Sequence, residues 1–359
     1  MKNQNQENIE LLSEISQPLL HWYDANARIL PWREEPTPYR VWVSEIMLQQ
    51  TRVEAVKPYF ERFLRALPSI PALAAAPEEQ ILKLWEGLGY YNRVRNLQKA
   101  AQIVVEQYGG RLPANYEALL TLPGIGSYTA GAIASIAYHI PVPAVDGNVL
   151  RVAMRILACR EDITKPAVKK SVEQAFAEIM PQKRAGDFNQ SLMELGATVC
   201  LPNGVAKCEV CPLNGLCRAY QQNLVAELPV KSEKRPRKIE ERTVFVITRG
   251  KKAALRKRGE SGLLAGLWEL PNTMGALNAA QAELLLKSWG LTPCETEPLP
   301  TAKHIFSHIE WHMSGWAVSV ETMSRKNGFI WADRHALAEK YTLPTAFQAY
   351  TKELVRRIK

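Results

Sequence analysis

The sequence predicts two successive domains of different class, an all-α domain followed by an α+β domain. Its 359 residues are enough for about two domains, each with its own core. Apolar residues recur at helical spacing up to about residue 220, with short Pro/Gly interruptions. Beyond residue 240, β-branched and aromatic runs alternate with shorter helical pieces. We therefore expect a helical domain over residues 1–225, a linker over 226–240 and an α+β domain over 241–359.

The first domain is predicted from several amphipathic stretches in which apolar residues recur with the period of an α-helix. The clearest of them are residues 41–56, 92–108, 149–159 and 188–200. The linker is predicted from residues 228–238 (LPVKSEKRPRK), where prolines and basic residues gather with almost no large apolar side chains. In the second domain, strands are expected at 243–248, 311–320 and 329–331, and helices near 279–289 and 345–356.

The composition and the charge of the chain exclude several classes of protein. Hydrophobic residues make up 47% and charged residues 23% of the chain, which excludes a disordered or collagen-like chain. The longest apolar stretch, residues 130–145, is too short for a membrane span and is interrupted by Gly and Pro. The first residues are polar and carry no secretory pattern, so we expect a cytoplasmic protein without a membrane partner. The formal net charge of +9 favours a polyanionic partner, although it is weak evidence alone.

Four of the six cysteines fall close together at the end of the helical domain. They are Cys200, Cys208, Cys211 and Cys217, separated by seven, two and five residues. Four thiolates on short loops can hold one zinc ion or one iron–sulfur cluster, and the spacing does not decide between them. Cys159 lies in a helical run and is expected in the core, and Cys294 is expected to have no ligand role.

A glycine-rich turn at residues 122–126 (LPGIG) joins two helical stretches. Gly124 and Gly126 allow the backbone to pass close to a ligand, and the free N–H groups of the following helix can bind a phosphate. The same pattern is also common as plain helix–turn–helix architecture. Asp146, just before an amphipathic helix, has the position of an N-cap, a role that is compatible with a functional one.

The turn, the distal aspartate and the cysteine loop together resemble the helix-hairpin-helix DNA glycosylase superfamily. Longer segments resemble its MutY-type adenine DNA glycosylases: residues 30–33 (LPWR), 44–53 (SEIMLQQTRV), 87–93 (GLGYYNR), 145–149 (VDGNV) and 306–308 (FSH). The resemblance implies a helix-hairpin-helix domain with a 4Fe-4S cluster on the four cysteines and a Nudix-like second domain. It also implies a monomer that removes adenine mispaired with 8-oxoguanine or guanine from double-stranded DNA. One departure is the seven-residue spacing after Cys200, where the family usually has six.

Two carboxyl groups are candidates for the chemistry of base removal, which needs an acid for the leaving base and a negative charge beside the sugar. On a helix, Glu45 has Val41, Trp42 and Leu48 as neighbours, and an apolar face favours a protonated carboxyl group. Asp146 precedes a helix, whose dipole should lower its pKa. The resemblance assigns the same roles: Glu45 protonates the adenine and Asp146 stabilises the sugar cation.

The resemblance also assigns further residues. Tyr128 stands where bifunctional relatives carry a Schiff-base lysine, and a phenol cannot form an imine, so we expect a monofunctional enzyme. Asn148 is expected to orient the water or Asp146. The remaining assignments are an adenine pocket of Arg28, Trp32, Arg33 and Leu48, and DNA contacts from Gln50, Tyr90, Gly124 and Gly126.

In the second domain, Phe306, Ser307 and His308 are expected by resemblance to recognise 8-oxoguanine. A hydroxyl and an imidazole can bond the N7–H and O8 groups that distinguish this lesion from guanine. Nucleotide hydrolysis is disfavoured, because residues 279–290 hold one acidic residue, Glu283, and no Arg-Glu-x-x-Glu-Glu run. The histidines at 304, 308 and 312 are too far apart in an extended strand to share a metal ion.

Two other functions compete with adenine removal. A lyase-type glycosylase for oxidised pyrimidines has the same helical fold, but Tyr128 and the second domain count against it. A non-catalytic DNA-binding protein could use the hairpin and the cysteine loop alone, and it would need neither Glu45 nor Asp146.

Overall fold

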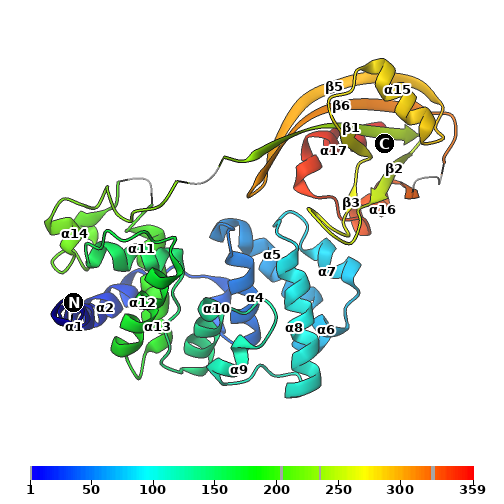
Figure 1. Ribbon diagram of the computed structural model, residues 1–359. Coiled ribbons are helices and arrows are strands. Elements are labelled where there is room, and N and C mark those ends of the chain that lie inside the picture. The colour runs from blue at the N-terminus through cyan, green and yellow to red at the C-terminus, as the bar shows by residue number, and fades with distance from the viewer. Residues whose placement is uncertain (1, 203–204, 234–235, 325–327) are drawn as a thin grey trace. The chain divides into compact units, whose positions relative to one another are not determined.

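The computed structural model describes residues 2–202, 205–233, 236–324 and 328–359. The chain forms two compact units (Figure 1). The first comprises Met1–Ala75 and Arg93–Glu233, and the second comprises Ala76–Asn92 and Lys234–Lys359. Within the described residues, no helix has the length and apolar character needed to cross a bilayer.

The described part of the first unit contains helices and loops but no strand. Its α-helices are α1 (Lys2–Glu14), α2 (Ser16–Asn26), α3 (Pro31–Glu34), α4 (Pro38–Leu48), α5 (Val53–Ala66), α6 (Ile70–Ala75), α8 (Asn92–Tyr108), α9 (Tyr116–Leu120), α10 (Ser127–Ala132), α11 (Gly147–Ile156), α12 (Pro166–Ile179), α13 (Ala185–Thr198) and α14 (Arg218–Gln221). A π-helical turn, η1 (Ile133–Ala137), continues α10, and a short 3-10 turn, η2 (Cys208–Val210), lies in the cysteine loop.

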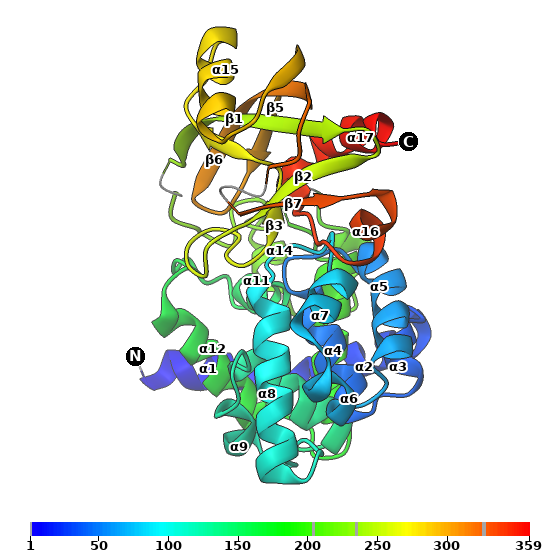
Figure 2. The same cartoon turned by 90° about the vertical axis from the view of Figure 1, so that its right-hand side faces the viewer.

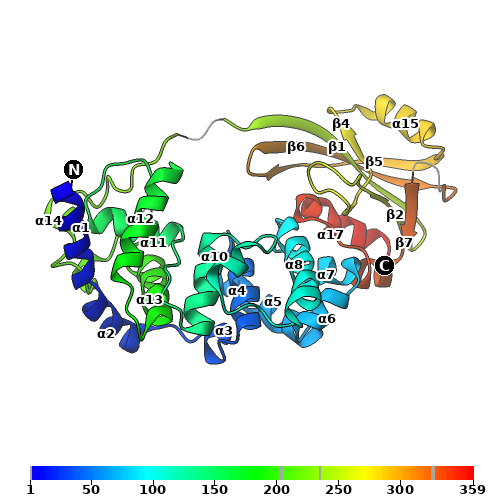
Figure 3. The same ribbon diagram turned by 60° about the horizontal axis from the view of Figure 1, so that its bottom comes forward.

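Local sequence explains how the helices that carry the site begin and end. Pro38 occupies the first turn of α4, and the Thr37 side chain caps it by accepting a hydrogen bond from the Arg40 N–H. The predicted helix over 41–56 is wrong in one respect, because it is broken into α4 and α5 where Gln50 adopts a φ of 58°. One apolar core joins α1 and α2 to α11, α12 and α13, and Figure 3 shows α1 lying beside α12. This core thus packs helices that are far apart in the sequence against one another.

The second unit is a mixed sheet covered on both faces. Its strands are β1 (Lys238–Arg249), β2 (Lys252–Lys257), β3 (Trp268–Glu269), β4 (Asn272–Met274), β5 (Pro293–Ile305), β6 (Ile309–Val320) and β7 (Phe329–Ala332), and its helices are α7 (Glu78–Leu84), α15 (Ala279–Ser288), α16 (Arg334–Glu339), the 3-10 turn η4 (Thr345–Phe347) and α17 (Gln348–Arg357). The strand order is β3-β2-β1-β6-β5, with β4 on β1 and β7 on β2. The central pair β1 and β6 is parallel, and the other pairs are antiparallel.

Side chains alternate along β1 between two cores. Val244 and Val246 pack in the core that contains Leu354 of α17, whereas Phe245 and Ile247 pack in the core that contains Leu286 of α15. The two helices therefore cover opposite faces of the sheet (Figures 1 and 2).

Two segments differ from the domain limits that the sequence predicts. Residues 76–92 belong to the second unit: Lys83 Nζ donates to the carbonyl oxygens of Leu337 at 2.9 Å and Tyr341 at 3.2 Å, and Glu86 accepts from the Leu343 N–H at 2.7 Å. The last three residues of the predicted linker, 238–240, belong to β1, because the ladder with β6 begins at Lys238. Linker residues 234 and 235 lie outside the described residues.

Candidate active site

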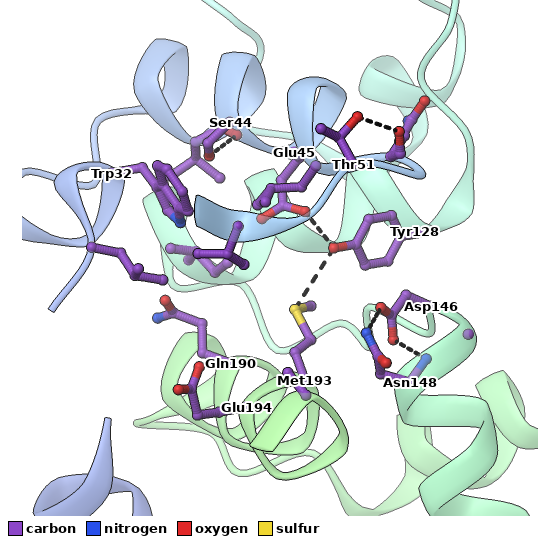
Figure 4. A pocket seen from close by; sticks show the side chains of 18 of the residues that line it. Trp32, Ser44, Glu45, Thr51, Tyr128, Asp146, Asn148, Gln190, Met193 and Glu194 are labelled. Carbon is purple, nitrogen blue, oxygen red and sulfur yellow. Dashed lines mark hydrogen bonds between the residues drawn. The ribbon is translucent and has the colours of Figure 1, made fainter. Parts of the chain in front are cut away.

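A cavity of about 730 Å³ opens in the first unit. Nine predicted site residues line it: Arg28, Trp32, Arg33, Glu45, Leu48, Gln50, Tyr128, Asp146 and Asn148. They come from the turn before α3, from α3, from α4 and the loop after it, and from α10 and α11. The cavity thus collects both proposed catalytic carboxyl groups and the proposed adenine pocket (Figure 4).

Glu45 is buried on α4, with 5% of its surface exposed. The Tyr128 hydroxyl donates a hydrogen bond to Glu45 Oε2, and Figure 4 shows the two side chains pointing toward each other. Burial raises the pKa of Glu45 from 4.5 to about 7, although the Tyr128 hydrogen bond lowers it. A large fraction of Glu45 is therefore protonated at neutral pH, as a general acid requires.

Tyr128 is held between Glu45 and α13. Its hydroxyl also lies 3.7 Å from the Met193 sulfur. Burial and the nearby carboxylates of Glu45 and Asp146 raise the pKa of Tyr128 well above its ordinary value. The phenol stays neutral at physiological pH and acts as a hydrogen-bond donor.

Asp146 caps α11, as its position before the helix predicts. Its Oδ1 accepts from the N–H groups of Asn148 at 2.8 Å and Val149 at 2.7 Å, and its Oδ2 accepts from Asn148 Nδ2 at 2.8 Å. The expected lowering of its pKa is wrong in direction, because burial raises the pKa more than these hydrogen bonds lower it. The Glu45 carboxyl group accepts one hydrogen bond, whereas that of Asp146 accepts three. Because these bonds stabilise the ionised form, we expect Asp146 to be a stronger acid than Glu45.

Asn148 connects the cavity to the cysteine loop. Arg151 Nη2 donates to Asn148 Oδ1 at 3.0 Å and to the Gly196 carbonyl at 2.7 Å, while Arg151 Nε donates to the Cys200 carbonyl at 2.9 Å. A Cβ atom on Gly196 would lie 2.6 Å from Asn148 Cβ, so only glycine permits this approach of α11 and α13. The Asn148 side chain is thus held by Asp146 through its Nδ2 and by Arg151 through its Oδ1.

Part of the cavity wall is a pair of arginines held by a buried acid. Glu194, 1% exposed, accepts from Arg28 Nε at 2.5 Å and from Arg33 Nη2 at 2.8 Å. Arg33 Nε also donates to Gln190 Oε1 at 3.0 Å. Burial would raise the pKa of Glu194, but the hydrogen bonds and charges of the two arginines lower it overall. Trp32, which packs edge-on against Phe60, completes this wall.

Sequence reasoning missed the contribution of α13. Gln190, Met193 and Glu194 line the cavity from this helix, and Lys169 lines it from α12. The sequence pattern of residues 188–200 predicts only an amphipathic helix, and the signal that could have revealed the site is Glu194 itself. An acid in the apolar run 192–196 (LMELG) has the same character as Glu45 on α4.

Two of the predicted DNA-contacting residues, Gln50 and Tyr90, share an unusual backbone conformation. Gln50 has a φ of 58° and Tyr90 a φ of 48°, a conformation that side-chain-bearing residues rarely adopt and that is common at functional sites. Gln50 is exposed at the cavity of the first unit. Tyr90 belongs to the second unit, where it is 50% exposed and its hydroxyl lies 3.3 Å from Ser307 Oγ.

The glycine turn has the shape that a close backbone approach requires. Gly124 has a φ of 78°, and a Cβ atom there would lie 2.8 Å from Asn96 Cβ. Gly126 is exposed, faces open space and caps α10 with its backbone. The next residues, Ser127 and Tyr128, start α10, so the turn leads directly into the cavity.

The four clustered cysteines surround one small hollow beside α11. Cys200, Cys208, Cys211 and Cys217 all line it, together with Arg155. Arg155 Nη1 donates to Cys200 Sγ at 3.2 Å and to the Leu201 carbonyl at 3.0 Å. Across the described ranges, no three His, Cys, Asp or Glu side chains are close enough to hold a single ion. The four thiols nevertheless share one hollow, as the ligands of a bound metal centre would.

The Phe306, Ser307 and His308 segment forms the turn between β5 and β6. The Phe306 N–H donates to the Ile309 carbonyl at 2.8 Å, which closes the turn. The Phe306 ring packs edge-on against Trp311 at 4.8 Å, whereas Ser307 and His308 are exposed. Phe306 anchors the turn, and Ser307 and His308 are exposed at its tip, with the Ser307 hydroxyl also in contact with that of Tyr90.

Comparisons with known proteins identify the class first. The family model described as HhH-GPD superfamily base excision DNA repair protein matches residues 43–179, and a NUDIX domain matches residues 243–353. A solved thermostable thymine-DNA glycosylase has a TM-score of 0.52 and 28% identity over 60% of this chain and 98% of its own. An endonuclease III–DNA complex, 24% identical with a TM-score of 0.52, shares the fold. The fold and the cavity thus define a base-excision DNA glycosylase.

The relatives narrow the class to one family. Proteins named adenine DNA glycosylase match most of this chain. They come from Rattus norvegicus (35% identical, covering 92% of this chain and 77% of the relative), Mus musculus (39%, 81% and 68%) and Buchnera aphidicola (34%, 89% and 92%). The chain belongs to the adenine DNA glycosylase family.

Proposed function

We propose that this enzyme hydrolyses the N-glycosidic bond of adenine mispaired with 8-oxoguanine, or with guanine, in double-stranded DNA. It acts as a monomer in the cytoplasm and without cleaving the strand. The observation that carries the proposal is the placement of two carboxyl groups, Glu45 and Asp146, in one cavity with different hydrogen-bond environments.

The adenine must first leave the base stack, which costs a few kcal/mol. Gln50 and Tyr90 carry the strained backbone and the exposed side chains suited to filling the gap. The turn at Gly124 and Gly126 offers backbone N–H groups to a phosphate of the same strand. Arg28, Trp32, Arg33 and Leu48 then form the walls around the extruded base.

In the chemical step, Glu45 donates its proton to the adenine ring as the bond between the base and C1′ breaks. The bonding electrons leave with the adenine, and the sugar becomes an oxocarbenium-like cation. The ionised Asp146, held by Asn148, stabilises that cation. Water then adds to C1′ and gives its proton to a carboxylate of the pair, leaving an abasic site.

A monofunctional outcome follows from Tyr128, whose phenol donates to Glu45 and cannot form an imine with the sugar. The lysine that lines the cavity, Lys169, is bound to Ser127 Oγ at 3.2 Å and lies 3.4 Å from Glu173. Its position is better suited to a phosphate near the hairpin than to attack on C1′.

The turn of Ser307 and His308 is proposed to select 8-oxoguanine opposite the adenine. Both side chains are exposed at the tip of a hairpin that Phe306 anchors on Trp311. Each can donate and accept a hydrogen bond, which suits a lesion that differs from guanine at N7–H and O8.

The four cysteines fit a 4Fe-4S cluster, because four thiolate donors on short loops line one hollow, and the family resemblance favours the cluster over a single zinc ion. Cys200, Cys208, Cys211 and Cys217 would hold it. When bound, the cluster supplies iron–thiolate bonds that cross-link this loop. Iron and sulfide analysis with the visible spectrum tests the assignment, and stoichiometric zinc in a colourless protein would contradict it.

The test of the proposed function is single-turnover base release from a duplex with adenine opposite 8-oxoguanine, using wild type and Asp146→Asn. Asparagine is a good N-cap, so the fold and duplex binding should persist while release falls by about 10³-fold or more. We expect free adenine from wild type, with strand breaks only after alkali. Breaks without alkali would contradict the monofunctional assignment, and equal release by both proteins would remove Asp146 from the mechanism.

A further inference from the structure

The second unit carries a strongly basic pocket that the proposed mechanism does not use. It has a volume of about 320 Å³ and lies where β1, β2, β3 and β4 meet the loop after β2. Four cations and one acid are among its lining residues: Arg242, Arg256, Lys257, Arg258 and Glu269. The positive charge is concentrated on one concave surface.

Glu269 fixes the direction of two of these arginines. It is 3% exposed and accepts from Arg256 Nη2 at 3.0 Å and from Arg258 Nη1 at 2.5 Å. Asn272 Nδ2 donates to the same carboxylate at 2.8 Å, and Arg258 Nε donates to the Leu263 carbonyl at 2.9 Å. Guanidinium groups held in this way lose little conformational entropy when a ligand binds.

Arg242 is fixed by a different set of contacts. Its guanidinium lies 4.2 Å from the centre of the Trp311 ring, and its Nη groups donate to Asn272 Oδ1 at 3.0 Å and Glu240 Oε2 at 3.2 Å. Its Nε is buried and has no partner in the described part of the chain. Since a buried donor without an acceptor is costly, this atom favours an acceptor supplied from outside the protein.

The pocket has more donors than the protein uses. Among the described residues, no acceptor bonds Arg256 Nη1, Arg258 Nη2 or Lys257 Nζ. Glu269 in the pocket and Glu240, which pairs with Arg242, together supply two negative charges against four cations. Several fixed guanidinium groups beside an ammonium group match the charge and the several oxygens of a phosphate.

We propose that this pocket binds a phosphate group, carried either by the DNA backbone or by a free nucleotide. Charge alone does not distinguish these two sources. The residues that line the pocket do not belong to the Phe306 turn. The proposal of a phosphate site is therefore independent of the proposed mechanism of adenine removal.

The first test is an equilibrium titration of the full-length protein with inorganic pyrophosphate. Lys257→Gln removes a cation with no partner in the described residues, so no carboxylate is left unpaired, and affinity should fall about threefold to fivefold. Lys252→Gln makes the same change on the same strand, outside the pocket, and should leave affinity unchanged.

Glu269→Gln provides a test of opposite sign. It keeps the shape of the side chain and an oxygen that can still accept from an arginine, but it removes the negative charge that partly neutralises Arg256 and Arg258. Pyrophosphate should bind at least about threefold more tightly. Thermal unfolding of each variant checks that it is folded. If Glu269→Gln does not fold, the comparison of Lys257→Gln with Lys252→Gln still tests the proposal.

A second arm distinguishes the sources by the salt dependence of duplex binding. If the pocket holds a backbone phosphate, Lys257→Gln should reduce the slope of log K against log salt by up to about 0.9, and Lys252→Gln should not. Pyrophosphate binding with an unchanged slope would assign the pocket to a free nucleotide. Absence of pyrophosphate binding together with equal slopes for both lysine variants would overturn the proposal.

Discussion

The cavity of the first unit and the sheet of the second unit both contain glutamates with limited exposure, but they surround them differently. In the cavity, Glu45 bonds to a neutral phenol and, within the described residues, has no cation within ion-pair distance, so burial raises its pKa to about 7. In the sheet, burial acts on Glu240 in the same direction, but hydrogen bonds from Lys238 and Arg242 lower its pKa overall. The number of cations in contact, more than depth, decides whether a carboxyl group is an acid or a fixed anion.

Glu194 makes the same comparison inside the cavity. It is buried at least as deeply as Glu45, yet Arg28 and Arg33 lower its pKa. One cavity therefore holds a carboxyl group suited to proton donation and another suited to holding two arginines in place. Variants at these positions test whether contacts with cations set the two pKa values.

The largest effect is expected from Glu45→Gln. Without its acid, single-turnover release of adenine should fall by about 10²- to 10⁴-fold. Below the unfolded pKa of about 4.5, Glu45 is protonated in both states and costs no stability. Between pH 4.5 and about 7 the unfolded state loses its proton while the folded state keeps it, so stability falls over this range and levels off once both states are ionised. At pH 8 the variant should thus be more stable than wild type by at most about 3 kcal/mol. Urea unfolding at pH 5 and pH 8 measures this, and lower stability at pH 8 would contradict the account.

Glu194→Gln should have the opposite effect on stability. It leaves the charges of Arg28 and Arg33 without their buried partner, which we expect to cost about 3 kcal/mol. Adenine release should also slow as the two arginines lose their positions. The same unfolding experiment compares it with Glu45→Gln, and stabilisation by both variants would show that cation contacts do not separate the two glutamates.

The pH profile of wild-type release should follow the acid. Since Glu45 acts in its protonated form, the single-turnover rate should decline as pH rises through about 7, approaching tenfold per pH unit above it. Rates measured from pH 5.5 to 9 check this. A rate that stays level from pH 6 to 9 would mean that another group donates the proton.

The smallest effect is expected in the second unit. Ser307→Ala with His308→Ala should reduce the preference for adenine opposite 8-oxoguanine over guanine by up to about tenfold, because two exposed hydrogen-bonding groups are lost. Ser288→Ala, at the end of α15, is the matched control for loss of a hydroxyl. Equal slowing on both mispairs would assign the turn a structural role.

Sequence periodicity predicted the elements whose pattern is local. The predicted helices at 92–108 and 279–289 match α8 and α15, and the predicted strands at 311–320 and 329–331 match β6 and β7 within two residues. It did not predict the break at Gln50, because the helical pattern of apolar residues continues across it.

The site was predicted only in part, for the same reason. Glu45 and Asp146 could be proposed from their neighbours in sequence, namely an apolar helix face and a helix start. The hydrogen bonds from Arg28 and Arg33 to Glu194 join positions about 160 residues apart, so no local sequence pattern could predict them. The direction of the pKa shift of Asp146 also depended on burial by distant helices, which outweighed the capping bonds that the sequence did predict.

The central claim is that Glu45 is protonated near neutral pH while Asp146 is the stronger acid. Side-chain carboxyl ¹³C NMR of protein labelled at Glu and Asp, titrated from pH 3 to 9, tests it most directly, with Glu45→Gln and Asp146→Asn identifying the two resonances. We predict that the signal lost in Glu45→Gln titrates with a midpoint of about 7 and that the signal lost in Asp146→Asn titrates at lower pH. A midpoint for Glu45 near its ordinary 4.5, or an Asp146 midpoint above that of Glu45, would contradict the account.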